Sequence, residues 1–144
     1  MTAACVFCRI AAGEVPSNMV HRGERVIAFL DRAPLFLGHT LVVPIAHVAT
    51  LDDAPPDLIE PLFETVRRTS VAVQRALAAA GSFVAVNTRV SQSVPHVHVH
   101  VVPRHEGDGL FSPRPIWRRR SYESDAEAAE YADRIRAVFE APVR

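Results

Sequence analysis

The segment VPHVHVHVVP, residues 94–103, most constrains what this chain can fold into, because three histidines alternate in it with valines. Successive side chains of a β-strand point to opposite faces, so residues two apart share a face. The alternation therefore predicts a half-buried strand with His96, His98 and His100 on one face and valines on the other. One such histidine is commonly a hydrogen-bonded core group or an exposed ring. Three in register indicate a functional site, because imidazoles are costly to bury without partners.

The composition is that of one ordinary domain with enough apolar residues to bury a core, and we expect a single domain over residues 1–144. Sixteen basic residues, all arginine, balance sixteen acidic ones. A neutral chain gives no electrostatic footprint for a nucleic-acid polymer or an anionic membrane surface. No apolar stretch approaches the roughly twenty residues that cross a bilayer, and the first residues lack the pattern of a secretory signal. We therefore expect a cytoplasmic protein that binds neither nucleic-acid polymers nor membranes.

Two cysteines, Cys5 and Cys8, form a C-x-x-C motif and are the only cysteines in the chain. A structural disulfide is unusual in a reducing compartment, which leaves a metal site, a redox pair or chance. A redox motif would have to open a helix that follows a strand. A C-x-x-C supplies only half of a tetrahedral zinc site. Two further ligands are therefore needed before a metal site is indicated.

Apolar residues at helical spacing predict one long helix over residues 57–80. Asp57 and Glu60 form a plausible capping pair at its start, and Gly81 follows as a stop. Pro61 falls in the first turns, where it removes one hydrogen bond or kinks the helix.

Two shorter helices and five strands complete the expected fold. CVFCRIAAGE fits a short helix that ends near Gly13, and Ser124 with Glu127 makes an S-x-x-E capping box that opens a closing helix. Strand patterns lie in SNMVHRG, RVIAFLD, HTLVVPI, SFVAVNTRV and HVHVHVVP, of which the first three suit an antiparallel meander. Strands grouped with helices at either end predict an α+β fold with an antiparallel sheet.

The segment GDGLFSPRPIWRRR, residues 107–120, is predicted to be an irregular loop, because it is rich in glycine, proline and arginine. Its basic cluster is most simply a solvated surface. Trp117 either shares that surface or contacts a partner subunit or a ligand.

With the triple histidine placed on a strand after VNTRVSQS, the chain resembles the histidine triad family of nucleotide hydrolases and transferases. The resemblance is carried by CVFCRIAAGEVP, AFLDRAPLFLGHTLVVPIAHV and NTRVSQSVPHVHVHVVPR, which make up most of residues 5–104. It implies a five-stranded antiparallel sheet with a long helix, usually in a homodimer that extends the sheet. These elements agree with those predicted from the pattern of the chain.

By this resemblance His98 is the nucleophile that attacks the α-phosphorus of a nucleotide and carries the nucleotidyl group covalently. A neutral imidazole suits this role at pH 7, provided that one ring nitrogen donates to a backbone carbonyl and the other faces phosphorus. His100 is the neighbouring triad residue, and His39 matches a further histidine of the hydrogen-bond relay. His96 is the remaining triad residue, placed to protonate the leaving group unless it binds a metal.

The resemblance also assigns the substrate contacts. Asp31 matches the carboxylate that accepts the ribose hydroxyls. The positions that match phosphate contacts are Asn87, Gln92 and Ser93, and those that match the apolar walls around the base are Phe7, Ile10 and Phe29. Taken without the resemblance, the former are also typical of turns and the latter of a plain core. The loop NTRVSQS lacks the glycines that the family often places there to admit the phosphates.

Some bacterial members of the family, and the related galactose uridylyltransferases, hold a zinc ion with an N-terminal C-x-x-C and two histidines. The matching residues in this sequence are Cys5, Cys8, His47 and His96. Two thiolates and two imidazoles make a closed, structural zinc site without an open position for water. We expect zinc in this role and no organic cofactor. If His96 binds zinc, the leaving group must take its proton from elsewhere.

Three functions are compatible with these features. The first is a nucleotidyl hydrolase or transferase that acts on a nucleoside phosphoramidate, a dinucleoside polyphosphate or a similar conjugate of adenosine or another purine nucleotide. The second is a metal-dependent enzyme that uses His-x-His-x-His as catalytic ligands, which would need a further carboxylate or histidine on a facing strand. The third is a nucleotide-binding module with negligible turnover. HVHVHVVPR resembles the polyphosphate-cleaving fragile histidine triad branch, whereas the C-x-x-C and the length resemble bacterial Hint-like proteins.

Overall fold

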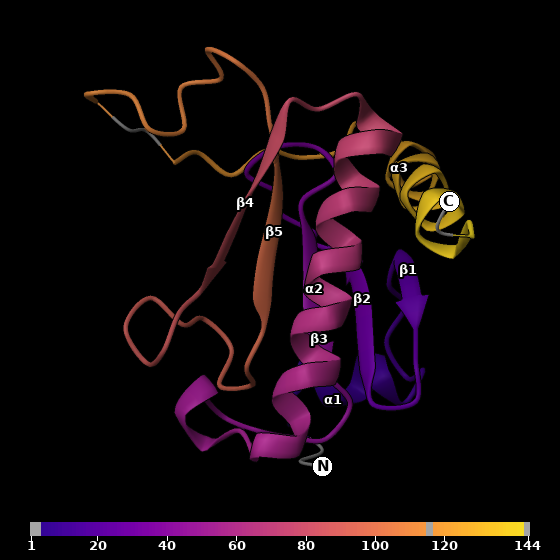
Figure 1. Ribbon diagram of the computed structural model, residues 1–144, viewed down its shortest axis with the longest axis vertical. Coiled ribbons are helices and arrows are strands. Elements are labelled where there is room, and N and C mark those ends of the chain that lie inside the picture. Colours follow the sequence, from indigo (N-terminus) through magenta and orange to yellow (C-terminus); the bar gives the residue numbers. More distant parts are fainter. Residues whose placement is uncertain (1–3, 115–116, 143–144) are drawn as a thin grey trace.

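The computed structural model describes residues 4–114 and 117–142. These residues form a five-stranded antiparallel sheet, with the strand order β1-β2-β3-β5-β4, and α-helices on both of its faces (Figure 1). In chain order the elements are α1 (Val6–Ala11), β1 (Met19–Arg22), β2 (Val26–Leu30), β3 (Thr40–Pro44), a short 3-10 helix (Leu51–Asp53), α2 (Pro56–Leu77), β4 (Gly81–Val86), β5 (Val99–Arg104) and α3 (Asp125–Glu140). The predicted α+β fold with one long helix is confirmed.

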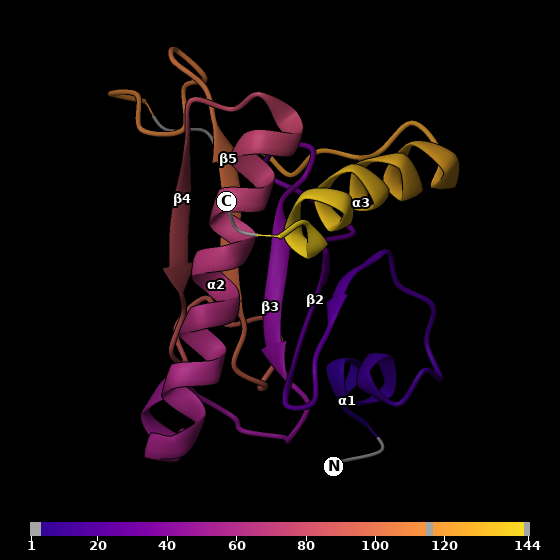
Figure 2. The same ribbon diagram turned by 45° about the vertical axis from the view of Figure 1, so that its right-hand side comes forward.

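Helices cover the sheet unequally on its two faces. The long α2 lies along one face with α3 beside it, and the short α1 packs on the other (Figures 1 and 2). Along β2, Val26, Ala28 and Leu30 join the core under α2 and α3, whereas Ile27 and Phe29 join the cluster around α1. Because both faces are covered, every residue of β2 and β3 is buried.

The predicted meander is confirmed by the antiparallel pairing of β1 with β2 and of β2 with β3. The last strand, β5, then inserts between β3 and β4. Its residue His100 pairs with Leu41 of β3, on the face that α1 covers, while Val99 and Val101 join the core under α2. The separation of histidines and valines onto two faces is therefore confirmed for β5.

The strand that carries the histidines is shorter than the sequence predicts. It begins at Val99, so only His100 lies within it, and His96 and His98 precede it in an extended approach segment. The reason is the pairing of that segment: the Val97 N–H donates to the carbonyl of Val48, in the loop after β3, at 2.7 Å. The segment is thus held by a loop instead of a strand ladder.

Both predicted ends of the long helix are wrong. Helix α2 begins at Pro56, and no side chain caps it, so Asp57 and Glu60 are not a capping pair. Proline at the first helical position has no N–H of its own to leave unpaired, and its fixed φ suits the start of a helix. At the other end, Ala78 adopts the left-handed conformation with φ of 50° and ends the helix, and Gly81 instead begins β4.

The two short helices follow their predicted signals. Helix α1 ends before Gly13, whose φ of 77° is the left-handed conformation that stops a helix. Helix α3 is capped by Ser124, which accepts a hydrogen bond from the backbone N–H of Glu127 at 3.1 Å. The Glu127 carboxylate accepts in return from the N–H of Glu123, one residue before the expected position. No helix of the described residues is long and apolar enough to cross a membrane.

The loop before α3 is irregular, as predicted. The Trp117 indole N–H donates to the carbonyl of Leu110 at 2.9 Å, and its ring contacts Phe83 and Phe111 edge to face. Trp117 remains half exposed on this aromatic cluster. The prediction that it contacts a partner subunit or a ligand stays a prediction.

Gly38, directly before β3, is expected to be intolerant of a side chain. Its φ is +97°, and a Cβ atom there would lie 2.2 Å from Cδ1 of Leu77. Gly38→Ala should therefore lower the free energy of unfolding by about 2–3 kcal/mol, because backbone strain adds to displacement of the leucine. Gly13→Ala, with φ of +77° and open space around it, should cost only about 1 kcal/mol. Urea unfolding measures both, and equal losses would show that the contact with Leu77 does not matter.

Candidate active site

The tautomer of His98 is fixed by its own backbone neighbourhood. Its Nδ1 lies 2.8 Å from the carbonyl oxygen of His96. A carbonyl can only accept, so Nδ1 carries the proton and donates it. The lone pair of the neutral ring is consequently on Nε2. His98 is almost fully buried and lines a mostly apolar cavity with a volume of about 360 Å³.

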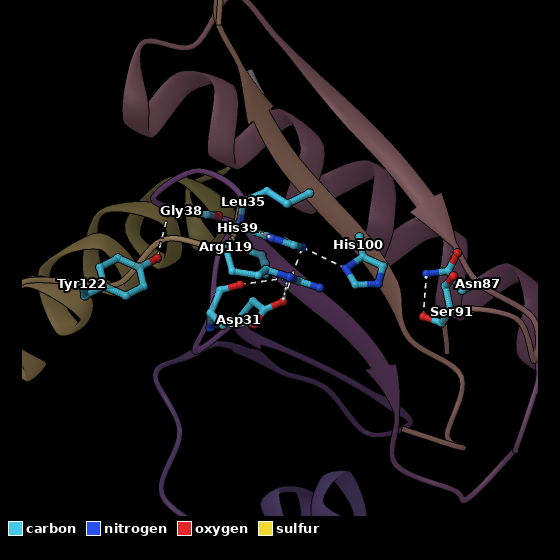
Figure 3. Close-up of polar contacts among 11 residues, drawn as sticks. Asp31, Leu35, Gly38, His39, Asn87, Ser91, His100, Arg119 and Tyr122 are labelled. Carbon is cyan, nitrogen blue, oxygen red and sulfur yellow. Dashed lines mark hydrogen bonds and ion pairs between the residues drawn. The ribbon is translucent and has the colours of Figure 1, made fainter. Parts of the chain in front are cut away.

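A second chain of hydrogen bonds fixes the tautomers of His39 and His100 (Figure 3). The backbone N–H of Leu35 donates to Nδ1 of His39 at 3.1 Å, so the neutral His39 ring holds its proton on Nε2. That Nε2 lies 2.9 Å from Nδ1 of His100 and donates to it. His100 must therefore carry its own proton on Nε2. The result is a donor on His100 and a lone pair on His98, two rings whose centroids are 5.0 Å apart.

The three histidines are neutral at pH 7. Burial, helped by the charges of neighbouring groups, lowers the pKa of His39 to about 2 and that of His100 to about 4. Burial also lowers the pKa of His98 below its ordinary value. The tautomers derived from the hydrogen bonds are those of neutral rings, so geometry and charge agree.

The predicted apolar walls and the predicted ribose carboxylate line the same cavity. Phe7 and Ile10 come from α1, Phe29 from β2, and Asp31 from the turn after β2. The Phe7 ring stands edge-on to His98, with 5.1 Å between the ring centroids. Helix α1 therefore forms one wall directly over the histidine.

The loop before β5 contributes unequally. Ser93 lines the cavity, whereas Asn87 and Gln92 do not. The Asn87 side-chain amide donates to the carbonyl of Ser91, and the Gln92 side chain bonds the N–H of Arg89 and the carbonyl of Ala49. These two side chains hold the loop, in keeping with the turn chemistry that the sequence also allowed.

A cluster of two thiols and two imidazoles is formed by residues that do not line this cavity. One donor atom from each residue lies within 4.8 Å of all the others, the residues being Cys5, Cys8, His47 and His96. The Cys5 sulfur is 3.3 Å from His96 Nδ1, and the Cys8 sulfur is 3.4 Å from His47 Nδ1. Bond lengths of zinc to sulfur and nitrogen place tetrahedral ligand atoms about 3.3–3.8 Å apart. The four predicted ligands are thus together at a spacing that fits zinc.

The orientation of His96 agrees with a ligand role. Its Nε2 lies 2.8 Å from the carbonyl oxygen of Pro44, to which it donates, so the lone pair is on the Nδ1 that faces the thiols. His96 is fully buried and does not line the cavity. It therefore cannot protonate a leaving group there.

A second group, Asp31, His39 and His100, also brings metal-ligating atoms within 4.8 Å of one another. Its protons argue against a metal. His39 Nδ1 already accepts from the Leu35 N–H, so a metal on Nε2 would require the ring to lose its only proton. Within this group His39 and His100 are joined instead by a hydrogen bond.

Arg119 is a site residue that the sequence analysis missed. Its Nη1 donates to Oδ2 of Asp31 at 2.8 Å and to the carbonyl of Ala33 at 2.9 Å, and the side chain lines the cavity (Figure 3). The only signal was the run of arginines at residues 118–120, which resembles an ordinary solvated surface.

Comparison with known proteins gives one family throughout. The HIT domain model matches residues 12–107. An uncharacterized HIT-like protein of Methanocaldococcus jannaschii is 45% identical over 107 residues, which are 73% of this chain and 82% of that protein. The adenylylsulfatase HINT3 of Arabidopsis thaliana is 32% identical over 134 residues, 92% of this chain and 68% of that protein. Among solved structures, a zinc-bound histidine triad family protein from Mycobacterium smegmatis has a TM-score of 0.80 and 34% identity, covering 94% of this chain and 93% of its own.

The depressed pKa of His39 makes stability depend on pH. Its pKa is about 2 in the fold against 6.5 for the ordinary group, so the unfolded chain binds more protons and stability is lost as pH falls below about 6.5. Each such group contributes a slope of at most about 1.4 kcal/mol per pH unit. His39→Gln should therefore flatten the dependence of the unfolding free energy between pH 6 and pH 4.5, measured with urea. The same substitution at the exposed His105 should leave the slope unchanged, and an unaltered slope in the His39 variant would contradict the assignment.

Proposed function

The chain belongs to the histidine triad family, and from this premise we propose that it is a nucleotidyl hydrolase or transferase whose covalent intermediate forms on His98. The family includes nucleotide hydrolases, among them the adenylylsulfatase relative. The observation that carries the proposal is the tautomer of His98, whose Nδ1 proton is held by a carbonyl while its Nε2 lone pair is left for a bond to phosphorus. A neutral, buried imidazole on an apolar cavity is a competent nucleophile at pH 7.

The two steps balance on this ring. Nε2 attacks the α-phosphorus, the bond from phosphorus to the leaving group breaks, and the leaving group takes a proton from water. The ring then carries a positive charge, which the hydrogen bond from Nδ1 to the His96 carbonyl stabilises. Water attacks the same phosphorus in the second step, the phosphorus–nitrogen bond breaks, and neutral His98 returns. The proton that this water loses replaces the one that the leaving group took from solvent. Another nucleophile in place of water would give transfer.

His100 contacts the phosphate oxygens in this proposal, and His39 acts through His100. Charge develops on the non-bridging oxygens of the α-phosphate, and a fixed N–H donor there lowers the barrier. The proton on His100 Nε2 is such a donor, because His39 blocks the other nitrogen. Ser93 is a second donor from the cavity rim. Asn87 and Gln92 shape the loop and would contact phosphate only after leaving their present partners.

The cavity suits an adenosine or other purine nucleotide. Phe7, Ile10 and Phe29 supply apolar walls for a base, and Asp31 supplies acceptors for the ribose hydroxyls. We therefore propose as substrates nucleoside phosphoramidates, dinucleoside polyphosphates and similar conjugates of AMP. The Arabidopsis thaliana relative is an adenylylsulfatase, which supports an AMP conjugate as substrate.

Cys5, Cys8, His47 and His96 would hold a structural zinc ion. The donor set, the spacing and the zinc-bound relative from Mycobacterium smegmatis support this. The ion would tie α1 to the segment that carries the nucleophile, since Cys5 and Cys8 lie at the start of the helix that also presents Phe7 and Ile10 to the cavity. No organic cofactor enters the proposal.

We also propose that the protein is a cytoplasmic homodimer. The strand β4 lies at one edge of the sheet (Figure 1), and its side chains are mostly half-buried, with Val84 42% exposed. Strand edges of this length are usually covered in native proteins, and a second copy would cover this one.

Replacing the nucleophile should abolish turnover without unfolding the chain. His98→Asn should lower kcat on an adenosine phosphoramidate by at least roughly 1,000-fold, because the covalent step is lost. Rapid quenching of the unaltered protein with a slow substrate should place the nucleotidyl label on His98. His105→Asn, an exposed histidine outside the cavity, is the matched control and should keep full activity. AMP binding without label or product would instead favour a binding module.

Zinc should be needed for stability and not for chemistry. Cys8→Ser should remove most of the bound zinc, measured by elemental analysis, and lower the midpoint of thermal unfolding by roughly 10 °C. Excess chelator added to the intact protein should leave most of the initial activity. Activity that vanishes with chelator while the fold survives would favour the metal-dependent alternative.

A further inference from the structure

Arg119 lies where a substrate would meet the mouth of the cavity. It comes from the loop before α3, far along the chain from Asp31, and its Nη1 bonds both Asp31 and the Ala33 carbonyl (Figure 3). The side chain is 49% exposed, whereas that of Asp31 is only 15% exposed. The carboxylate is thus inside the site and the guanidinium at its entrance.

The contact with Asp31 uses one corner of the guanidinium. Arg104, by contrast, pairs with Asp108 through two nitrogens, Nε and Nη2, at 2.7 and 2.8 Å. Arg119 uses Nη1 alone, and its Nε and Nη2 have no hydrogen-bond partner among the described residues. The edge formed by Nε and Nη2 is the flat fork that binds a phosphate or carboxylate through two parallel hydrogen bonds.

The loop is anchored so that this fork stays in place. The next residue, Arg120, donates its backbone N–H to the Pro34 carbonyl at 2.6 Å and its Nε to the Leu35 carbonyl at 3.1 Å. Its guanidinium carbon also lies over the Phe36 ring, 5.1 Å from the ring centroid. The anchor is the segment whose Leu35 N–H orients His39, so Arg119 is fixed to the same frame as the catalytic relay.

The charges around the cavity leave Arg119 a role toward an anion. The charged residues that line it are Asp31, Arg32 and Arg119, and the histidines are neutral. Asp31 still has acceptor positions for ribose hydroxyls, because a carboxylate offers about four lone-pair sites and only the Ala33 N–H and Arg119 use them here. Arg119 therefore need not leave when a ribose binds.

We propose that Arg119 binds a second anionic group of the substrate, a phosphate or sulfate in addition to the α-phosphate that His98 attacks. This inference rests on the proposed function, since it concerns the same cavity. The group could be carried by the ribose, next to Asp31, or by the leaving group beyond the α-phosphate. Either source makes Arg119 a specificity-determining residue that favours nucleotides with two separate anionic groups over AMP conjugates with only one.

The test compares three ligands with the His98→Asn protein, in which nothing is turned over. AMP, 3′-phosphoadenosine 5′-phosphate and ADP are titrated by calorimetry. At least one of the two doubly anionic ligands should bind about 10- to 100-fold more tightly than AMP, and Arg119→Gln should remove that preference while changing AMP affinity little. Arg119→Lys, which keeps the charge and loses the fork, should restore only part of it. The neighbouring Arg118→Gln, outside this cavity, is the matched control and should retain the preference.

The two sources and the two proposals separate in the same experiment. A preference for the 3′-phosphate places the group on the ribose, and a preference for ADP places it on the leaving group. If neither ligand exceeds AMP, or if the preference survives Arg119→Gln or is lost with Arg32→Gln alone, the role of Arg119 is overturned while nucleotide binding stands. Absence of AMP binding would overturn both the nucleotide site and this inference.

Discussion

Backbone groups that fix the proton positions of three histidines, and through His39 that of His100, are the constraint on which the rest of the site depends. The carbonyl of His96 accepts a hydrogen bond from the His98 ring, and the carbonyl of Pro44 accepts one from the His96 ring. The Leu35 N–H donates to the lone pair of the His39 ring. Each bond leaves the opposite nitrogen with one possible role. Because backbone positions are held by the whole fold, each imidazole is kept in one tautomer, with its proton on one nitrogen and its lone pair on the other, as the proposed roles require.

Helix α1 joins two parts of the molecule that have different chemistry. Its first turn carries Cys8, beside Cys5, toward the imidazoles of the thiol–imidazole cluster, and the same helix places Phe7 and Ile10 on the cavity. A helix of six residues is too short to be stable by itself, so its position must come from tertiary contacts. The cluster around Phe29 and Leu41 provides them from the sheet. Anchoring this helix thus also shapes the wall over His98.

Local signals in the sequence identified the elements more reliably than their ends. Gly13 and Ser124 ended α1 and capped α3 as predicted, because a left-handed glycine and a serine cap act within a few residues. The long helix departed from prediction at both ends, where Pro56 starts it without a cap and Ala78 takes the left-handed conformation. The end of this helix is set by the turn that leads into β4, and not by the conformational preference of Ala78 itself.

The sequence by itself determined the separation of the histidine and valine faces, because that follows from a period of two. Through the family resemblance it also pointed to most of the residues that meet at the cavity and the thiol cluster, but not to Arg119. Only the tertiary structure decided which nitrogen of each ring carries the proton. The groups that decide it or hold the segment, namely the Pro44 carbonyl, the Leu35 N–H and Val48, are far from the triad along the chain and carry no recognisable side-chain signal. The tertiary structure also decided that Arg119 reaches Asp31 across 88 positions of sequence. Contacts between backbone groups and distant loops depend on how the chain is folded, and the order of residues alone does not specify them.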